Sequence, residues 1–237
     1  MVSGLKWIWR SENSFNQIDM NILELELLTN DIESTATFYN EIMGLNIISK
    51  NSSSISFETK ETKLTFRLTE IEKPVYHFAF DIPNNQLLEA FAWIEAKTEI
   101  LEVIPPDKIA NFYNWNAKSF YFYDNNGNIL EFIARYNLDN KSDKLFHGSS
   151  IVSVSEIGFV SKNILAVCDE ICYKFGLSVF PMQPKLEKFI VLGTETGLFI
   201  LVKEGRDWYP TVIKAKPFWK KVTFRMEKET KVFETNY

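Results

Sequence analysis

The stretch NILELELLTNDIESTATFYNEIMGL, residues 21–45, decides the fold of this 237-residue chain. Its first part, 21–29, alternates between leucines on one face and polar side chains, including Glu24 and Glu26, on the other. Strict alternation predicts a β-strand, because successive side chains of a strand point to opposite faces. The two carboxylates are therefore expected together on one face of this strand.

A helix is predicted to follow the strand. Asn30 is a suitable N-cap residue, and Glu33 three positions later completes a capping-box pattern. Gly44 suits the end of the helix, where a left-handed residue is common. Apolar residues recur between them at helical spacing: Ile32, Ala36, Tyr39 and Met43. Three β-rich segments come next, at 45–49, 55–58 and 64–68, so the unit has the order β-α-β-β-β.

This unit, here called a module, recurs along the chain. The second module has a strand at 75–82, a helix that opens at Asn84 or Asn85, a short strand near 101–104 and a hairpin of 119–123 with 129–134. The third begins with a strand at 153–161 and is followed by a last strand at 222–226. The match of Glu156 to Glu24 and of Gly176 to Gly44, both 132 positions apart, supports a true repeat.

Composition restricts the class of protein. The chain is 46% hydrophobic and 24% charged, as in ordinary globular proteins. Its net charge of −5 without a basic run indicates no nucleic-acid partner, and its apolar runs are too short for a membrane span. The N-terminus lacks the apolar core of a secretion signal. Cys168 and Cys172 are expected to be free thiols, so a cytoplasmic location is predicted.

Three motifs, in this order, resemble the vicinal oxygen chelate superfamily, which includes glyoxalases, bleomycin-resistance proteins and extradiol dioxygenases. They are DIESTATFY at 31–39 with Gly44-Leu45 after it, HFAF at 77–80, and DNNGNILEF at 124–132. The resemblance implies an α+β fold in which repeated βαβββ modules form a curved mixed sheet around a cleft, with helices on the outside.

The expected domain division follows from the resemblance and the repeat. Residues 1–138 are predicted to hold two paired modules, with 1–18 as an N-terminal arm. Residues 139–150 are predicted to be a linker, and 151–237 a third, incomplete module. This last part is expected to form a smaller sheet with the strand at 222–226, against the first domain or a second subunit.

The resemblance also implies a divalent-metal site with Glu24, His77 and Glu131 as ligands. Position 24 departs from the family pattern, which usually has His there. One imidazole and two carboxylates suit Mn²⁺, Fe²⁺, Zn²⁺ or Mg²⁺, and a metal-free, hydrogen-bonded cluster is the alternative. Glu26, on the same strand face as Glu24, is the candidate catalytic base. Glu156 is not expected to form a second site, because its matching partner position falls near Lys221, which is no ligand.

A substrate pocket is predicted around aromatic residues and one arginine. Arg67 is suited to an anionic substrate group, and a solvated surface position is its alternative. The aromatic residues are suited either to line the pocket or to fill the core. The candidates are Arg67, Trp115, Tyr121 and Tyr123.

Three functions are compatible with these residues. The first is a metal-dependent enzyme, a lyase, an isomerase or a dioxygenase, that acts on a small oxygen-bearing molecule. The second is a non-catalytic protein that sequesters a small molecule without metal, as bleomycin-resistance proteins do. The third is a structural dimer module with a vestigial site. A small-molecule ligand is the expected partner, and a homodimer is compatible with the sequence.

Overall fold

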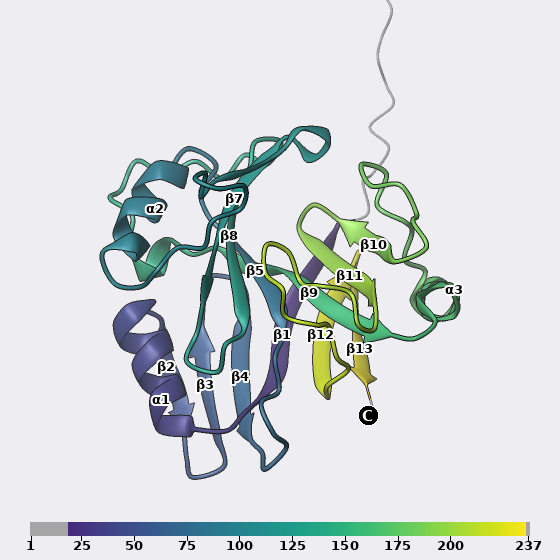
Figure 1. Ribbon diagram of the computed structural model, residues 1–237, viewed down its shortest axis with the longest axis horizontal. Helices are drawn as coiled ribbons and strands as arrows, with labels where there is room; N and C mark the ends of the chain where they lie inside the picture. Colours follow the sequence, from purple (N-terminus) through teal and green to yellow (C-terminus); the bar gives the residue numbers. More distant parts are fainter. Residues whose placement is uncertain (1–18, 236–237) are drawn as a thin grey trace, which may run out of the picture.

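The computed structural model describes residues 19–235, so the predicted arm at 1–18 lies outside the described residues. The fold is α+β, and its βαβββ modules form two curved sheets (Figure 1). The six-stranded sheet has the order β13-β12-β1-β4-β3-β2, and the seven-stranded sheet has the order β10-β11-β9-β5-β8-β7-β6.

The first module contributes four strands to the six-stranded sheet: β1 (Met20–Thr29), β2 (Asn46–Lys50), β3 (Ser54–Glu58) and β4 (Lys63–Leu68). Its helix begins as α1 (Ile32–Ala36) and continues as a π-helical segment, Thr37–Ile42. Asp31, and not the predicted Asn30, is the N-cap, because its Oδ1 accepts a hydrogen bond of 3.0 Å from the backbone N–H of Ser34. Gly44 has a φ of +66°, as expected for a helix end.

The second module lies in the seven-stranded sheet. It consists of β5 (His77–Asp81), α2 (Leu87–Glu95), β6 (Ala110–Phe112), β7 (Ala117–Tyr123) and β8 (Ile129–Arg135). The strand predicted at 101–104 is replaced by isolated bridges, and β6 forms at 110–112, where the sequence indicated no strand. Pro105 and Pro106 explain the difference, because neither can donate a ladder hydrogen bond.

The third module also lies in the seven-stranded sheet. It consists of β9 (Ser153–Ser161), α3 (Ile164–Phe175), β10 (Phe189–Thr194) and β11 (Gly197–Lys203). The chain then forms a hairpin of β12 (Lys220–Met226) and β13 (Glu229–Thr235). The sequence indicated β12 but not β13, whose residues are mostly exposed and show no clear apolar alternation.

The modules pair differently from the predicted domain division. β5 pairs antiparallel with β9, which joins the second module to the third. β1 pairs antiparallel with β12, which joins the first module to the C-terminal hairpin. The first two modules therefore lie in different sheets, and the strand predicted at 222–226 is not in the sheet of the third module. With β8 on its other side, β5 has no free edge for β1.

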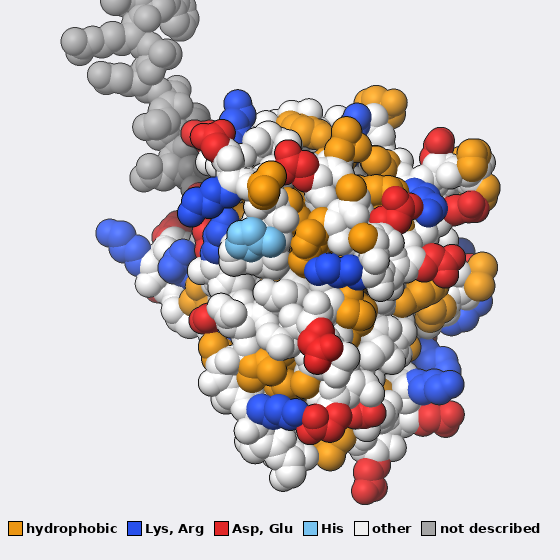
Figure 2. Space-filling model, turned by 90° about the vertical axis from the view of Figure 1, so that its left-hand side faces the viewer, with side chains coloured by type: hydrophobic (Ala, Val, Ile, Leu, Met, Phe, Trp, Pro, Cys, Tyr) orange, Lys and Arg blue, Asp and Glu red, His pale blue; other side chains and the backbone are white. Residues whose placement is uncertain are grey.

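The main core lies between the sheets and the helices. Along β5, Phe78 and Phe80 join this core, whereas His77, Ala79 and Asp81 point to the opposite face. Figure 1 shows α1 and α2 at one end of the molecule and α3 at the other. On the face that carries α1 and α2, acidic, basic and hydrophobic side chains are interspersed (Figure 2). Among residues 19–235, none of the helices has the length and apolar character needed to cross a membrane.

Candidate metal centre

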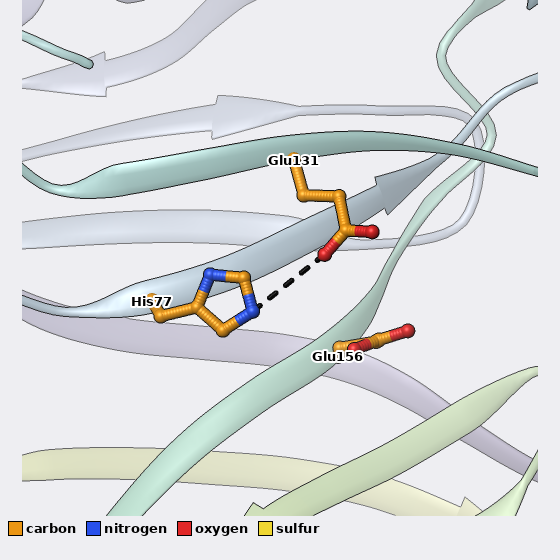
Figure 3. Close-up of side chains that lie close together, drawn as sticks. All are labelled: His77, Glu131 and Glu156. Carbon is orange, nitrogen blue, oxygen red and sulfur yellow. Dashed lines mark ion pairs between the residues drawn. The ribbon is translucent and has the colours of Figure 1, made fainter. Parts of the chain in front are cut away.

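His77 presents one ring nitrogen to two carboxylates. Its Nδ1 lies 3.0 Å from the backbone oxygen of Ile129 on the neighbouring strand β8. Because a carbonyl oxygen only accepts hydrogen bonds, Nδ1 carries the hydrogen, and Nε2 of the neutral ring keeps its lone pair. Burial lowers the pKa of His77, which favours this neutral ring. Nε2 lies 3.6 Å from Oε2 of Glu131 (Figure 3).

Glu131 and Glu156 complete a buried cluster with His77. One possible ligand atom from each of the three residues lies within 4.8 Å of the other two. The pairing of the strands explains why they meet. Ala79 on β5 is paired with Glu131 of β8 on one side and with Glu156 of β9 on the other, and its small side chain leaves room between them. His77 is two residues before Ala79, on the same face of the strand.

Arg135 balances only part of the negative charge around this cluster. The guanidinium is fully buried; its Nε donates a hydrogen bond of 3.1 Å to Asp81, and its Nη2 donates to Glu156. With all three carboxylates ionised, the formal charge is −3 + 1 = −2. Burial, with Glu156 adding to it, raises the pKa of Glu131 to about 8, and burial raises that of Asp81 to about 6. Protons or a cation must therefore compensate the excess charge.

The residues fit a divalent cation. A neutral imidazole nitrogen and two carboxylates are a common donor set for Mn²⁺, Fe²⁺ and Zn²⁺, and a charge of +2 matches the excess of −2. The pairing of β11 with β9 indicates which residue takes the place of a fourth ligand. In the second module, Glu131 of β8 is paired with Ala79, which lies two residues after His77 on β5. In the third module, Gly158 lies two residues after Glu156 on β9, and its partner on β11 is Ile200, whose side chain cannot bind a metal. Among residues 19–235, the cluster thus offers three residues that could hold such an ion.

A cavity of about 350 Å³ opens over the cluster. Such a volume is at the lower end of small-molecule sites. Aromatic side chains form much of its wall, and a few polar and charged side chains complete it. The lining residues are His77, Phe112, Trp115, Tyr121, Glu131, Glu156, Gln183, Leu186, Phe189, Ile200, Arg206, Trp208 and Tyr209.

Trp208 closes the cavity directly over His77, with 5.4 Å between the two ring centres. The position requires a glycine on β9. A Cβ added at Gly158 would lie 2.5 Å from Cη2 of Trp208 and 3.2 Å from the backbone oxygen of His77. Gly158 therefore lets the indole approach the strand and form part of the wall.

Comparisons with known proteins identify a family that resembles part of the chain. Residues 21–132, a little under half of the chain, match the family model of the Glyoxalase/Bleomycin resistance protein/Dioxygenase superfamily. No curated protein matches the chain.

Solved structures show the same fold over most of the chain. A proposed dioxygenase from Bacillus subtilis subsp. subtilis str. 168 superposes with a TM-score of 0.59 at 13% identity, over 91% of this chain and 84% of the other. The V278E mutant of glyoxalase I from Zea mays superposes with a TM-score of 0.52 at 12% identity, over 93% and 76%. At such low identity, the likeness concerns the fold alone.

The structure places the predicted ligand Glu24 away from His77 and Glu131. Glu24 lies on β1 in the six-stranded sheet, where its Oε1 is 2.7 Å from Nζ of Lys63. The reason is the pairing of the modules, since β1 and β5 lie in different sheets. Glu156, which opens the third module as Glu24 opens the first, takes its place beside His77. Glu156 was expected only not to form a second site, and here it joins the cluster that contains His77 and Glu131.

The predicted base Glu26 and the predicted pocket residue Arg67 also lie in the six-stranded sheet. Glu26 is buried and forms ion pairs with Arg67 and with Lys221, the latter at 2.9 Å. Glu24, Glu26 and Arg67 line a separate polar hollow. The structure thus places Glu26 and Arg67 apart from the His77 cluster.

The aromatic candidates divide between the cavity and its surroundings. Trp115 and Tyr121 line the cavity, whereas Tyr123 packs beside it without lining it. Sequence reasoning missed Arg135, Arg206 and Trp208. The internal repeat was a signal for Glu156, but no local pattern marked the other three, because they become neighbours only through the pairing of the second and third modules.

Proposed function

We propose that the chain is a divalent-metal-dependent enzyme of this superfamily that acts on a small oxygen-bearing molecule. His77, Glu131 and Glu156 hold the ion. The observation that carries the proposal is their convergence: three buried atoms that could act as ligands lie within 4.8 Å of one another, beside one arginine that pairs with only part of the carboxylates. When bound, the ion supplies Lewis acidity toward substrate oxygens.

The residues around the ligands fix their orientation and exclude water. The carbonyl oxygen of Ile129 holds the ring of His77, and Arg135 holds the carboxylate of Glu156. Burial and the charge of Glu131 raise the pKa of Tyr121 well above its usual value, so its phenol stays protonated beside Glu131. The aromatic walls keep the site dry, which strengthens polar interactions with a substrate.

The first prediction concerns the ligands. We expect purified protein to retain one divalent ion per chain, and Mn²⁺, Fe²⁺, Zn²⁺ or Mg²⁺ to raise the melting temperature of chelator-treated protein. His77→Ala and Glu156→Gln should each lower the metal affinity by at least ~10-fold, because a buried ligand is lost. Elemental analysis and isothermal titration calorimetry measure both effects.

Glu24→Gln is the matched control. It removes a carboxylate in the position that the sequence favoured, but Glu24 lies in the other sheet beside Lys63. Metal content and affinity should therefore equal those of the wild type. Loss of metal in Glu24→Gln with retention in Glu156→Gln would overturn the assignment.

A second candidate function is small-molecule binding without metal. The observation in its favour is the ion pair between Arg135 and Glu156, which already compensates one carboxylate, beneath a largely aromatic cavity. The chelator experiment separates the two functions. Protein that never takes up metal but binds an aromatic ligand in this cavity is a sequestering protein.

We also propose a cytoplasmic protein, because Cys168 and Cys172 are free thiols, which persist in reducing compartments. A homodimer stays a prediction from the sequence. Localisation of a tagged chain tests the compartment, and light scattering during size-exclusion chromatography tests the oligomeric state.

A further inference from the structure

Arg206 lines the cavity and lies in the loop that follows β11. Its backbone is fixed on both sides by the opposite arm of this loop: Gly205 donates a hydrogen bond of 2.9 Å to the oxygen of Ala215, and the N–H of Ala215 donates one of 2.7 Å to the oxygen of Arg206. A side chain on such a fixed loop is positioned before any ligand arrives.

The guanidinium of Arg206 is half-buried and has no carboxylate partner among residues 19–235. It packs over the ring of Phe189, with 4.8 Å from Cζ to the ring centre. The adjacent Asp207 forms its ion pair with Lys214, at 2.6 Å. Burial lowers the pKa of Arg206, and the charge of Asp207 partly offsets this effect. An anion at this place would compensate the charge.

The same cavity is lined by this cation, by the metal cluster and by aromatic rings. His77, Glu131 and Glu156 are buried, whereas Gln183, Arg206 and Tyr209 are more exposed. The rings of Trp115, Tyr121 and Trp208, which also line the cavity, are at most 8% exposed. Tyr121 and Tyr209 meet edge to face at 5.5 Å. Flat, polarisable walls of this kind favour an aromatic ring.

We propose that the cavity takes a small aromatic acid, whose ring lies between the aromatic walls and whose carboxylate binds Arg206. Its oxygens at the opposite end face His77, Glu131 and Glu156, and only this part rests on the proposed metal function. Arg206 is thus a specificity-determining residue that selects acids over neutral molecules of equal shape.

The probes are 3,4-dihydroxybenzoate and 3,4-dihydroxybenzamide, which share the ring and the vicinal oxygens but differ in charge. Isothermal titration calorimetry of metal-loaded wild-type protein should give at least ~10-fold tighter binding of the acid. Arg206→Gln should reduce this preference to less than about 2-fold while leaving the amide affinity unchanged. Arg206→Lys should restore part of the preference, because lysine has the positive charge but lacks the planar guanidinium, which can donate two parallel hydrogen bonds to a carboxylate.

Arg225→Gln is the matched control, since Arg225 is an exposed arginine on β12 outside the cavity. It should keep the full preference for the acid, and the melting temperatures of all variants show whether they are folded. Equal binding of acid and amide by the wild type, or an unchanged preference in folded Arg206→Gln, overturns the inference. Failure to bind either probe overturns it as well.

The outcomes separate this inference from the proposed function. If metal binds at His77 but acid and amide bind equally, the metal function stands and the role of Arg206 falls. If no metal binds and the acid still depends on Arg206, the anion site stands and the metal function falls. The second case is tested with benzoate and benzamide, which lack the vicinal oxygens: the affinities of these two compounds are compared in metal-free protein.

Discussion

Carboxylates lie in both sheets, and their immediate neighbours decide which can bind a cation. In the six-stranded sheet, Glu24 is paired with Lys63, and Glu26 with both Arg67 and Lys221. A metal there would have to displace bound ammonium and guanidinium groups. In the seven-stranded sheet, the neighbour of Glu131 is a neutral imidazole, and burial raises the pKa of this carboxyl to about 8. Of these two groups of carboxylates, only the second has charge that its basic neighbours leave unbalanced, which is why the proposed metal site is placed there.

Lys220 provides a prediction about pH. It is buried with its ammonium near the rings of Tyr76 and Phe159, and burial lowers its pKa to about 7. Because the unfolded chain then binds more protons than the native chain between pH 7 and 10.5, the free energy of unfolding rises with pH in this window. The contribution reaches at most about 1.4 kcal/mol per pH unit.

Urea unfolding of wild type and Lys220→Met at pH 7, 8 and 9 measures this effect. The stability of the wild type relative to the variant should increase with pH. Lys228→Met, which alters an exposed lysine, should show no such trend. A difference between wild type and Lys220→Met that is constant with pH would mean that Lys220 is charged in the native state.

At the scale of elements, strand register brings the cluster together and a glycine shapes the wall above it. His77 and Ala79 share one face of β5, and Ala79 is flanked by Glu131 and Glu156 on the adjacent strands. Gly158, two residues after Glu156 on the same face of β9, leaves the space that Trp208 occupies. Strand β9 thus carries both Glu156 and the glycine against which the indole of Trp208 packs.

Gly158→Ala should therefore affect both stability and binding. The added methyl group has no room beside Trp208 and the backbone of His77, and overpacking of this kind costs roughly 1–3 kcal/mol. Displacement of the indole should also weaken the binding of 3,4-dihydroxybenzoate. Denaturant unfolding and calorimetry measure the two effects.

A double mutant provides the control. Trp208→Phe shortens the ring that meets the new methyl group, so the loss of stability in Gly158→Ala should be smaller in the Trp208→Phe background. Strict additivity of the two substitutions would show that they do not meet.

For the whole molecule, the sequence indicated the modules but not their partners. Local sequence patterns predict strands β1, β5 and β9 and the helices that follow them. The three ordered motifs predict the fold of the superfamily. The pairing of modules depends on which strand edges meet, and alternation within one strand contains no information about its neighbour. That is why His77 and Glu131, from a single module, could be assigned together, whereas the third member of the cluster was placed at Glu24 instead of Glu156.

The pairing itself can be tested by cross-linking. Glu24 on β1 is directly opposite Thr223 on β12 in an antiparallel pair, a geometry with Cα atoms about 4.5–5.5 Å apart that a disulfide can bridge. In a background in which Cys168 and Cys172 are replaced by serine, Glu24→Cys with Thr223→Cys should form an intramolecular disulfide on mild oxidation. Glu24→Cys with Ala79→Cys should not, because β5 lies in the other sheet. Intact-mass measurement with and without reductant distinguishes the two, and cross-linking of the second pair but not the first would mean that the first module pairs with the second.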